Sequence, residues 1–173
     1  MRTRYVRIHV LEREQRLPAP PAAVFPFFAD ARNLEAITPP LLRFRVVTPE
    51  PIVMRPGTVI QYRLRLRGVS MSWLTTIQEW DPPHRFVDVQ LRGPYALWHH
   101  QHDLRDDGEG GTVMRDTVHY AIGFGPFGEL AHRLLVRRDL EAIFDFRAQR
   151  VQRLTCADLR PPPSSPSSPS ASP

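Results

Sequence analysis

The sequence predicts an α+β fold, in which about seven antiparallel strands wrap around one long C-terminal helix and two short helices follow the first strand. Three observations lead to this prediction. Segments that alternate between apolar and polar residues recur through the middle of the 173-residue chain. Short turns rich in Gly, Pro and Asp separate these segments, which favours antiparallel hairpins. After the last such segment, apolar residues recur at helical spacing.

The chain is expected to begin with a strand and two short helices. Residues 5–17 alternate in part, which predicts the strand. The segment PAPPAAVFPFFAD (18–30) suggests a helix with a proline in its first turn, although Pro26 would kink its interior. Asp30 can cap a second short helix that runs to about Ile37, because the Thr-Pro-Pro that follows cannot continue it.

The middle of the chain predicts a run of strands. The clearest is TVIQYRLRLR (58–67), which places Ile60, Tyr62, Leu64 and Leu66 on one face and glutamine and arginine on the other. The other predicted strands are 42–47, 72–80, 85–92, 96–105 and 112–122.

A helix of about 25 residues is expected to start near Pro126. Its apolar stripe comprises Val136, Leu140, Ile143, Phe144 and Val151, extended by Phe127, Leu130 and Leu134. The sequence PPPSSPSSPSASP (161–173) is of low complexity and is expected to be disordered. The folded domain is therefore placed at about residues 3–155.

Composition narrows the class of protein. The net charge is +5, but the basic residues are all arginine and are spread from Arg2 to Arg160, so a nucleic-acid surface is not expected. No apolar run is long enough to span a bilayer, and the N-terminus has no signal-peptide core. The single cysteine, Cys156, excludes an internal disulfide. A cytoplasmic protein is the expectation.

Five segments carry a resemblance to a known superfamily: PPAAVFPFFADARNLEAITPP (20–40), GTVIQYRLRLRG (57–68), EWDPPHRFVDVQLRGPYALWHHQH (79–102), GGTVMRDTVHYAIGFGPFG (110–128) and LEAIFDFR (140–147). The chain resembles the SRPBCC, or START-like, superfamily, and within it the bacterial ligand-binding SRPBCC domains. The resemblance implies a helix-grip fold with an apolar cavity between sheet and long helix, in a superfamily that includes lipid-transfer domains and polyketide cyclases. Some relatives carry this domain ahead of a nucleotide-sugar-epimerase-like domain.

The histidines of WHHQH (98–102) divide between the two faces of a strand. Trp98, His100 and His102 share the face assigned to the cavity, and His99 points away. With a hairpin turn at 106–111, a plausible register sets His102 opposite Asp116, close enough for a hydrogen bond.

Other polar residues are expected to join this patch. The strand that carries Asp88 and Gln90 is apolar on both faces, so the residues alone leave its orientation open, and the resemblance favours an inward Asp88 and Gln90. Arg147 lies on the helical stripe, and a buried charge needs a partner, so we expect it to pair with Asp88 or Asp116. The predicted ligand-binding set is Tyr62, Trp73, Asp88, Gln90, Tyr95, Trp98, His100, His102, Asp116, Tyr120, Ile143 and Arg147.

Three interpretations of the polar patch remain open. It can be a hydrogen-bond network joining sheet and helix, an anchor for the polar end of an apolar ligand, or an acid/base pair in which Asp116 orients His102. A metal is not expected, because one aspartate cannot easily be both a ligand and the group that orients a histidine, and no fourth ligand is indicated. No cofactor is expected, because GFGPFG (123–128) lacks the βαβ unit of a dinucleotide site.

The sequence therefore predicts a domain that binds a small, largely apolar, lipid- or polyketide-like ligand without catalysis. One alternative is a cyclase/dehydratase-like enzyme with His102 and Asp116 as its catalytic pair. The other is an interaction module for a separately encoded, epimerase-like partner. Neither nucleic-acid binding nor stable membrane insertion is expected.

Overall fold

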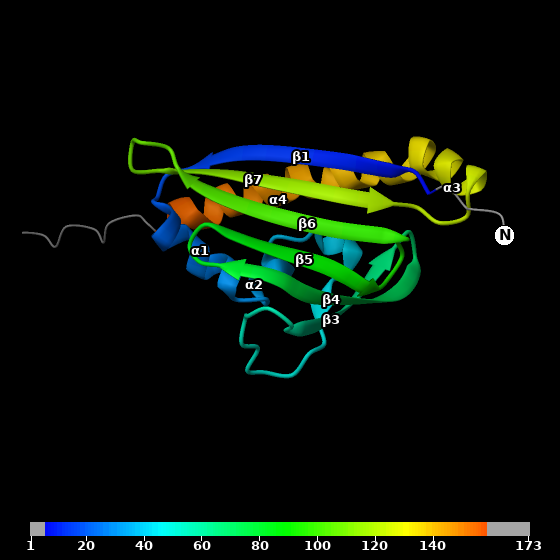
Figure 1. The fold of residues 1–173 in the computed structure, drawn as a ribbon, viewed down its shortest axis with the longest axis horizontal. Coiled ribbons are helices and arrows are strands. Elements are labelled where there is room, and N and C mark those ends of the chain that lie inside the picture. Colours follow the sequence, from blue (N-terminus) through cyan, green and yellow to red (C-terminus); the bar gives the residue numbers. More distant parts are fainter. Residues whose placement is uncertain (1–5, 159–173) are drawn as a thin grey trace, which may run out of the picture.

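A computed structural model describes residues 6–158, and the Pro/Ser segment at 161–173 lies outside the described residues. A seven-stranded antiparallel sheet, two short helices after the first strand and a long C-terminal helix confirm the predicted fold class (Figure 1). The strands are β1 (Ile8–Leu17), β2 (Arg45–Val46), β3 (Val59–Leu66), β4 (Val69–Asp81), β5 (Arg85–Arg92), β6 (Leu97–Asp106) and β7 (Thr112–Ala121). The helical segments are α1 (Pro21–Ala29), α2 (Asn33–Ala36), a 3-10 turn (Pro40–Leu42), α3 (Pro126–Ala131), a π-helical turn (His132–Val136) and α4 (Arg137–Asp158).

The strands lie in the order β1-β7-β6-β5-β4-β3-β2, so β1 is an edge strand that pairs with β7, the last strand of the chain. Every neighbouring pair is antiparallel. The β6–β7 hairpin pairs His102 with Asp116 and His100 with Val118, which confirms the predicted register. A correct register matters here, because a slip of one residue would turn both histidines to the opposite face of the sheet.

The helices give the sheet an inner face. Helix α4 runs behind the sheet, and α1 and α2 lie at one of its ends (Figure 1). Pro21 occupies the first turn of α1, where a missing backbone donor costs least, and Pro26 is accommodated inside the same short helix. Val151 of α4 is fully buried and belongs to the main hydrophobic core. In the described part of the chain, no helix is long and apolar enough to cross a membrane.

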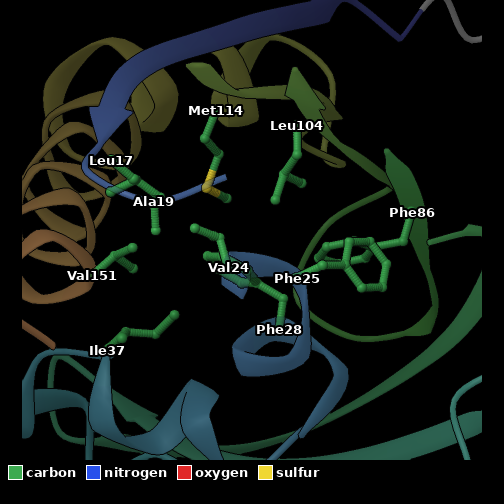
Figure 2. Packing of buried hydrophobic residues seen from close by; sticks show 10 residues of the cluster. All are labelled: Leu17, Ala19, Val24, Phe25, Phe28, Ile37, Phe86, Leu104, Met114 and Val151. Carbon is green, nitrogen blue, oxygen red and sulfur yellow. The ribbon is translucent and has the colours of Figure 1, made fainter. Parts of the chain in front are cut away.

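The largest apolar cluster joins α1, the sheet and the far end of α4 (Figure 2). Its members are Leu17, Ala19, Val24, Phe25, Phe28, Ile37, Phe86, Leu104, Met114 and Val151. The side chains in Figure 2 come from both sides of the space between sheet and helices, and they meet in its middle. This cluster fixes α1 against β5 and β6, directly beside the polar residues of the inner face.

Two predictions from the sequence were wrong. Phe127, Leu130 and Leu134 were expected to extend the buried stripe of the long helix, but they are 82%, 55% and 64% exposed. The helix begins at Pro126 as predicted, but its first part, α3, lies at the end of the sheet (Figure 1). It contacts β1 there through the polar pair His9 and Glu129, and its apolar side chains stay exposed. The predicted strand at 42–47 is reduced to Arg45–Val46, because Pro40–Leu42 forms a helical turn instead.

A bulge in β4 changes which residues face inward. Trp73, Thr75 and Ile77 alternate onto the cavity side, and strict alternation would place Glu79 next. The register between β4 and β5 shifts between Ile77 and Glu79, so Trp80 packs inward against Phe25 and Phe86 while Glu79 stays exposed. The bulge thereby keeps a charged residue out of the core.

Candidate functional site

A cavity of about 130 Å³ lies between the sheet and the helices. Its floor is the inner face of β3 to β6, and its cover comes from α1, α2 and Arg147 of α4. Most of the lining is aromatic or aliphatic, while one wall is polar and carries Asp88, His100 and His102. A mostly apolar pocket with a few placed polar groups is the usual form of a small-molecule site.

The polar wall is a cluster of four side chains from three neighbouring strands, Asp88 of β5, His100 and His102 of β6, and Asp116 of β7, referred to below as the His–Asp cluster. Asp116 Oδ1 lies 3.0 Å from His100 Nε2 and 2.7 Å from His102 Nδ1. Asp88 Oδ2 lies 3.4 Å from His100 Nδ1 and 3.3 Å from His102 Nε2. Each imidazole is therefore held between the same two carboxylates.

The four contacts are not equivalent. His100 Nε2 donates a hydrogen bond to Asp116, and His102 Nε2 donates a longer one to Asp88. His102 Nδ1 is the closest nitrogen to Asp116, but it is not aligned for a hydrogen bond. Packing fixes the rings: Phe86 stacks on His102 with centroids 3.8 Å apart, and His100 lies 3.8 Å from His102 on ring centroids.

Burial and mutual proximity set the charge of the His–Asp cluster. Burial, helped by the neighbouring His102, lowers the pKa of His100 to about 4. Burial by itself would raise the pKa of Asp116, but His102 and His100 outweigh it and hold that pKa well below its ordinary value. The hydrogen bond from His102 and the charges nearby also outweigh burial at Asp88 and lower its pKa. At neutral pH, both aspartates are ionised and His100 is uncharged.

The prediction that Arg147 pairs with an aspartate was wrong. Among the described residues, Arg147 makes no ion pair with Asp88 or Asp116, because both carboxylates are taken by the histidines. Its Nε is buried without a hydrogen-bond partner in this part of the chain, and its guanidinium carbon lies 5.8 Å from the centre of the Phe144 ring. Arg147 nevertheless lines the cavity, and its positive charge helps to lower the pKa of both aspartates.

Seven of the predicted ligand-binding residues line this cavity: Tyr62, Trp73, Asp88, Trp98, His100, His102 and Arg147. Asp116 lies behind the two histidines and contacts both. Burial raises the pKa of Tyr62 above its ordinary value, so its hydroxyl stays protonated on the cavity wall.

The other four predicted residues lie away from the cavity. Gln90 Nε2 donates to the backbone oxygen of Tyr95, which holds the β5–β6 turn. The Tyr120 hydroxyl lies 2.9 Å from His132 Nε2 at the start of the π-helical turn, and Ile143 lines a separate surface groove beside α4. The alternation along a strand predicts which face of the sheet a side chain occupies. It does not show whether that side chain lies at the level of the cavity or beyond its end.

Some lining residues were missed by the sequence interpretation, among them Phe28, Thr75 and Met54. Thr75 shares the face of Trp73 on β4, so alternation could have found it. Phe28 and Met54 come from a helix and a connecting segment, and no periodic signal points them at the sheet.

An open antiparallel sheet that wraps around a long helix, with a cavity between them, defines the helix-grip class of the SRPBCC superfamily. The chain belongs to the family described as polyketide cyclase/dehydrase and lipid transport, whose model matches residues 9–155. This assignment confirms the superfamily that the sequence motifs indicated. A search of curated proteins finds no match.

Solved structures with the same fold are distant in sequence. The Zhui aromatase/cyclase from Streptomyces sp. R1128 superposes with a TM-score of 0.71 at 16% identity, covering 89% of this chain and 97% of its own. The protein TTHA0849 from Thermus thermophilus gives 0.63 at 23% identity, covering 87% and 99%. A norcoclaurine synthase from Thalictrum flavum gives 0.65 at 11% identity, covering 89% and 98%. These likenesses establish the fold and leave the ligand open.

Proposed function

We propose that this domain binds a small, largely apolar molecule whose polar end lies against the His–Asp cluster. The observation that carries the proposal is the cavity itself, which combines an aromatic lining with one polar wall. The family description, which covers polyketide cyclases, dehydrases and lipid transport, supports a ligand-binding or cyclase-like role.

The cavity volume favours a compact ligand. An apolar protein cavity of about 150 Å³ can hold a benzene molecule, and the cavity here measures about 130 Å³. A molecule about the size of one aromatic ring therefore suits it without rearrangement. A long acyl chain or a polyketide of several rings would require α1, α2 or α4 to move outward.

Two buried donors favour a ligand that carries a hydrogen-bond acceptor. Trp73 Nε1 and Arg147 Nε are buried and have no hydrogen-bond partner among the described residues, and both side chains line the cavity. A buried donor without a partner costs about 1–3 kcal/mol, so an oxygen atom that accepts from either would add to the affinity. A ring with a carbonyl, hydroxyl or carboxylate substituent meets both requirements.

Tryptophan fluorescence offers a direct test, because Trp73 and Trp98 both line the cavity. We expect saturable quenching by single-ring compounds such as benzoate or acetophenone, and weaker or no response to palmitate. Arg147→Met keeps an apolar stem of similar length but removes the donors, so it should weaken binding of the acceptor-bearing ring by about tenfold. Arg153→Met, at an exposed position of the same helix, is the matched control and should leave binding unchanged.

Two results would contradict this proposal. If none of these rings binds and native mass spectrometry of the freshly purified protein shows a long-chain lipid instead, the cavity expands on binding and the ligand class is wrong. If neither kind of molecule binds, the ligand-binding function itself is wrong.

A cyclase/dehydratase-like enzyme is the second candidate. The observation that favours it is the placement of two histidines, each in contact with two carboxylates, on the wall of the cavity. An imidazole oriented in this way is suited to move a proton on a bound substrate. Turnover of a cyclisable polyketone that is lost in His102→Ala, with near-UV circular dichroism unchanged, would establish it; equal turnover in the variant would exclude His102 as the acid/base group.

A further inference from the structure

Three atoms of the His–Asp cluster that could ligate a metal lie close together on the polar wall. Asp88 Oδ2 lies 3.4 Å from His100 Nδ1 and 3.3 Å from His102 Nε2. The three ligand atoms all lie within 4.8 Å of one another. Both histidine side chains are almost fully buried, at 4% and 2% exposed, so these atoms cannot turn to bulk water.

The hydrogen bond of His100 determines what its other nitrogen offers. His100 Nε2 donates to Asp116, and a neutral imidazole has one N–H, so its Nδ1 presents a lone pair toward Asp88. His102 Nε2 donates to Asp88 in the metal-free arrangement, so an ion requires the proton of this ring to move to Nδ1. His102 Nδ1 lies 2.7 Å from Asp116 Oδ1, which accepts that proton's hydrogen bond once the ring turns to align it. Two nitrogen lone pairs and one carboxylate oxygen then face a common point.

We infer that Asp88, His100 and His102 form a binding site for a divalent transition-metal ion, with Asp116 as a positioning residue. Metal–ligand distances of about 2.0–2.2 Å put neighbouring ligand atoms about 2.9–3.5 Å apart in tetrahedral or octahedral geometry. The separations of 3.4 Å and 3.3 Å fall in this range and are longer than a typical N–H···O hydrogen bond. The oxygen-to-nitrogen separations therefore already match those of a metal site.

Two carboxylates remove the objection that the sequence raised against a metal. A single aspartate could not both ligate the ion and orient the histidines, but here Asp88 takes the first role and Asp116 the second. Asp116 contacts the far nitrogen of each ring, which is the usual outer contact of a metal-bound histidine. Two imidazoles with one carboxylate suit Zn²⁺, Fe²⁺ or Co²⁺ and do not suit Ca²⁺ or Mg²⁺, which prefer oxygen ligands throughout.

The open side of the site faces the cavity. Asp88, His100 and His102 all line it, so a fourth coordination position would be directed at whatever occupies the cavity. Three protein ligands with one open position distinguish metal sites that act on a ligand from closed structural sites. The inference goes beyond the proposed binding of an organic molecule and does not depend on it.

A second group of possible ligands, His9, Glu129 and His132, lies near the start of the long helix. It is less suited to a cation. Glu129 already lies 3.4 Å from both Arg7 and Arg133, and these charges repel a metal ion. His132 Nε2 is also engaged by the Tyr120 hydroxyl.

The test uses the metal alone, added to the full chain without a histidine tag after treatment with EDTA. Calorimetric titration with Zn²⁺ should show one ion bound per chain, and Co²⁺ should give the visible absorption of a nitrogen- and oxygen-ligated ion. Asp88→Asn and His102→Gln should each weaken Zn²⁺ binding at least a hundredfold, and Asp116→Asn by about 10–100-fold. His99→Gln is the matched control, since His99 lies on the same strand but faces away from the cavity, and it should bind like the unchanged protein.

Several results would overturn the inference. These are the absence of stoichiometric Zn²⁺ binding to the unchanged protein, equal affinity in Asp88→Asn, or affinity lost in His132→Gln and retained in His102→Gln. Asp88→Asn keeps the size of the side chain, so it serves where His102→Gln fails to fold, and circular dichroism decides which variants are folded. Because no organic ligand is present, failure here leaves the proposed ligand binding untouched, and the fluorescence titration without metal tests that separately.

Discussion

Replacing Asp116 with alanine tests how strongly the His–Asp cluster holds the sheet together. Asp116 is almost fully buried and lies within 3.0 Å of nitrogens on both His100 and His102. Its removal leaves the N–H of the neutral, buried His100 without its acceptor. A buried donor that loses its partner costs about 1–3 kcal/mol. For a domain of this size, that corresponds to a fall in Tm of roughly 2–12 °C.

Urea denaturation of the EDTA-treated protein measures this cost as a change in midpoint at constant slope. The matched control is Asp145→Ala, which removes an exposed carboxylate that pairs with Arg13 at 2.9 Å on the outside of α4. Exposed ion pairs contribute about 0–1 kcal/mol, so this variant should unfold close to the unchanged protein. A double-mutant cycle with His100→Ala isolates the contact, because it subtracts what each side chain contributes separately.

The reasoning fails if Asp116→Ala destabilises the protein no more than Asp145→Ala does. It also fails if the cycle with His100→Ala gives no coupling, since the two side chains would then act independently despite their 3.0 Å contact. Either result would mean that the network contributes little to stability and that its geometry is maintained by the surrounding packing alone.

Substitutions in the C-terminal helices and at His132 give two further predictions. Phe144→Ala should cost about 3–5 kcal/mol in urea unfolding because the ring is buried, whereas Phe127→Ala, 82% exposed, should change stability by about 0.5 kcal/mol or less; equal costs would contradict the assignment of the buried face. Burial and the stacked His9 ring lower the pKa of His132 below 6.5, so its NMR titration should have a midpoint under that value and shift upward in His9→Ala. Since the unfolded chain takes up this proton more readily, His132 should destabilise the fold as pH falls below 6.5. A midpoint that does not move in His9→Ala would show that the two rings do not interact.

Much of the architecture could be predicted because it depends on local pattern. The alternation in residues 58–67 and the short turn at 106–111 predicted the strands and their antiparallel order, and the same turn gave the pairing of His102 with Asp116. The division of WHHQH between two faces also followed, because side chains alternate along any strand.

Other features of the site required the assembled fold. The β4 bulge places Trp80 and not Glu79 on the inner face, and it is visible only in the pairing of β4 with β5. The exposure of Phe127 depends on where the sheet ends. Helical periodicity shows which residues share a face of the helix, but not whether the sheet reaches that face. Arg147 was expected to pair with an aspartate, but competition from two nearer histidines, which lie on a different element of the fold, decided otherwise.

The sequence by itself determined the α+β class, the facing of the regularly alternating strands and the inward placement of His100, His102 and Asp116, because these depend on spacing along the chain. The helix-grip class and the inward Asp88 followed from the resemblance of the motifs to a known superfamily. Only the tertiary structure brought Asp88 to the opposite side of the same imidazoles and closed a compact cavity over them. The reason is physical: which carboxylate reaches which nitrogen depends on distances across three strands and on the helices that exclude water. These are set by packing and not by the order of residues along any one element.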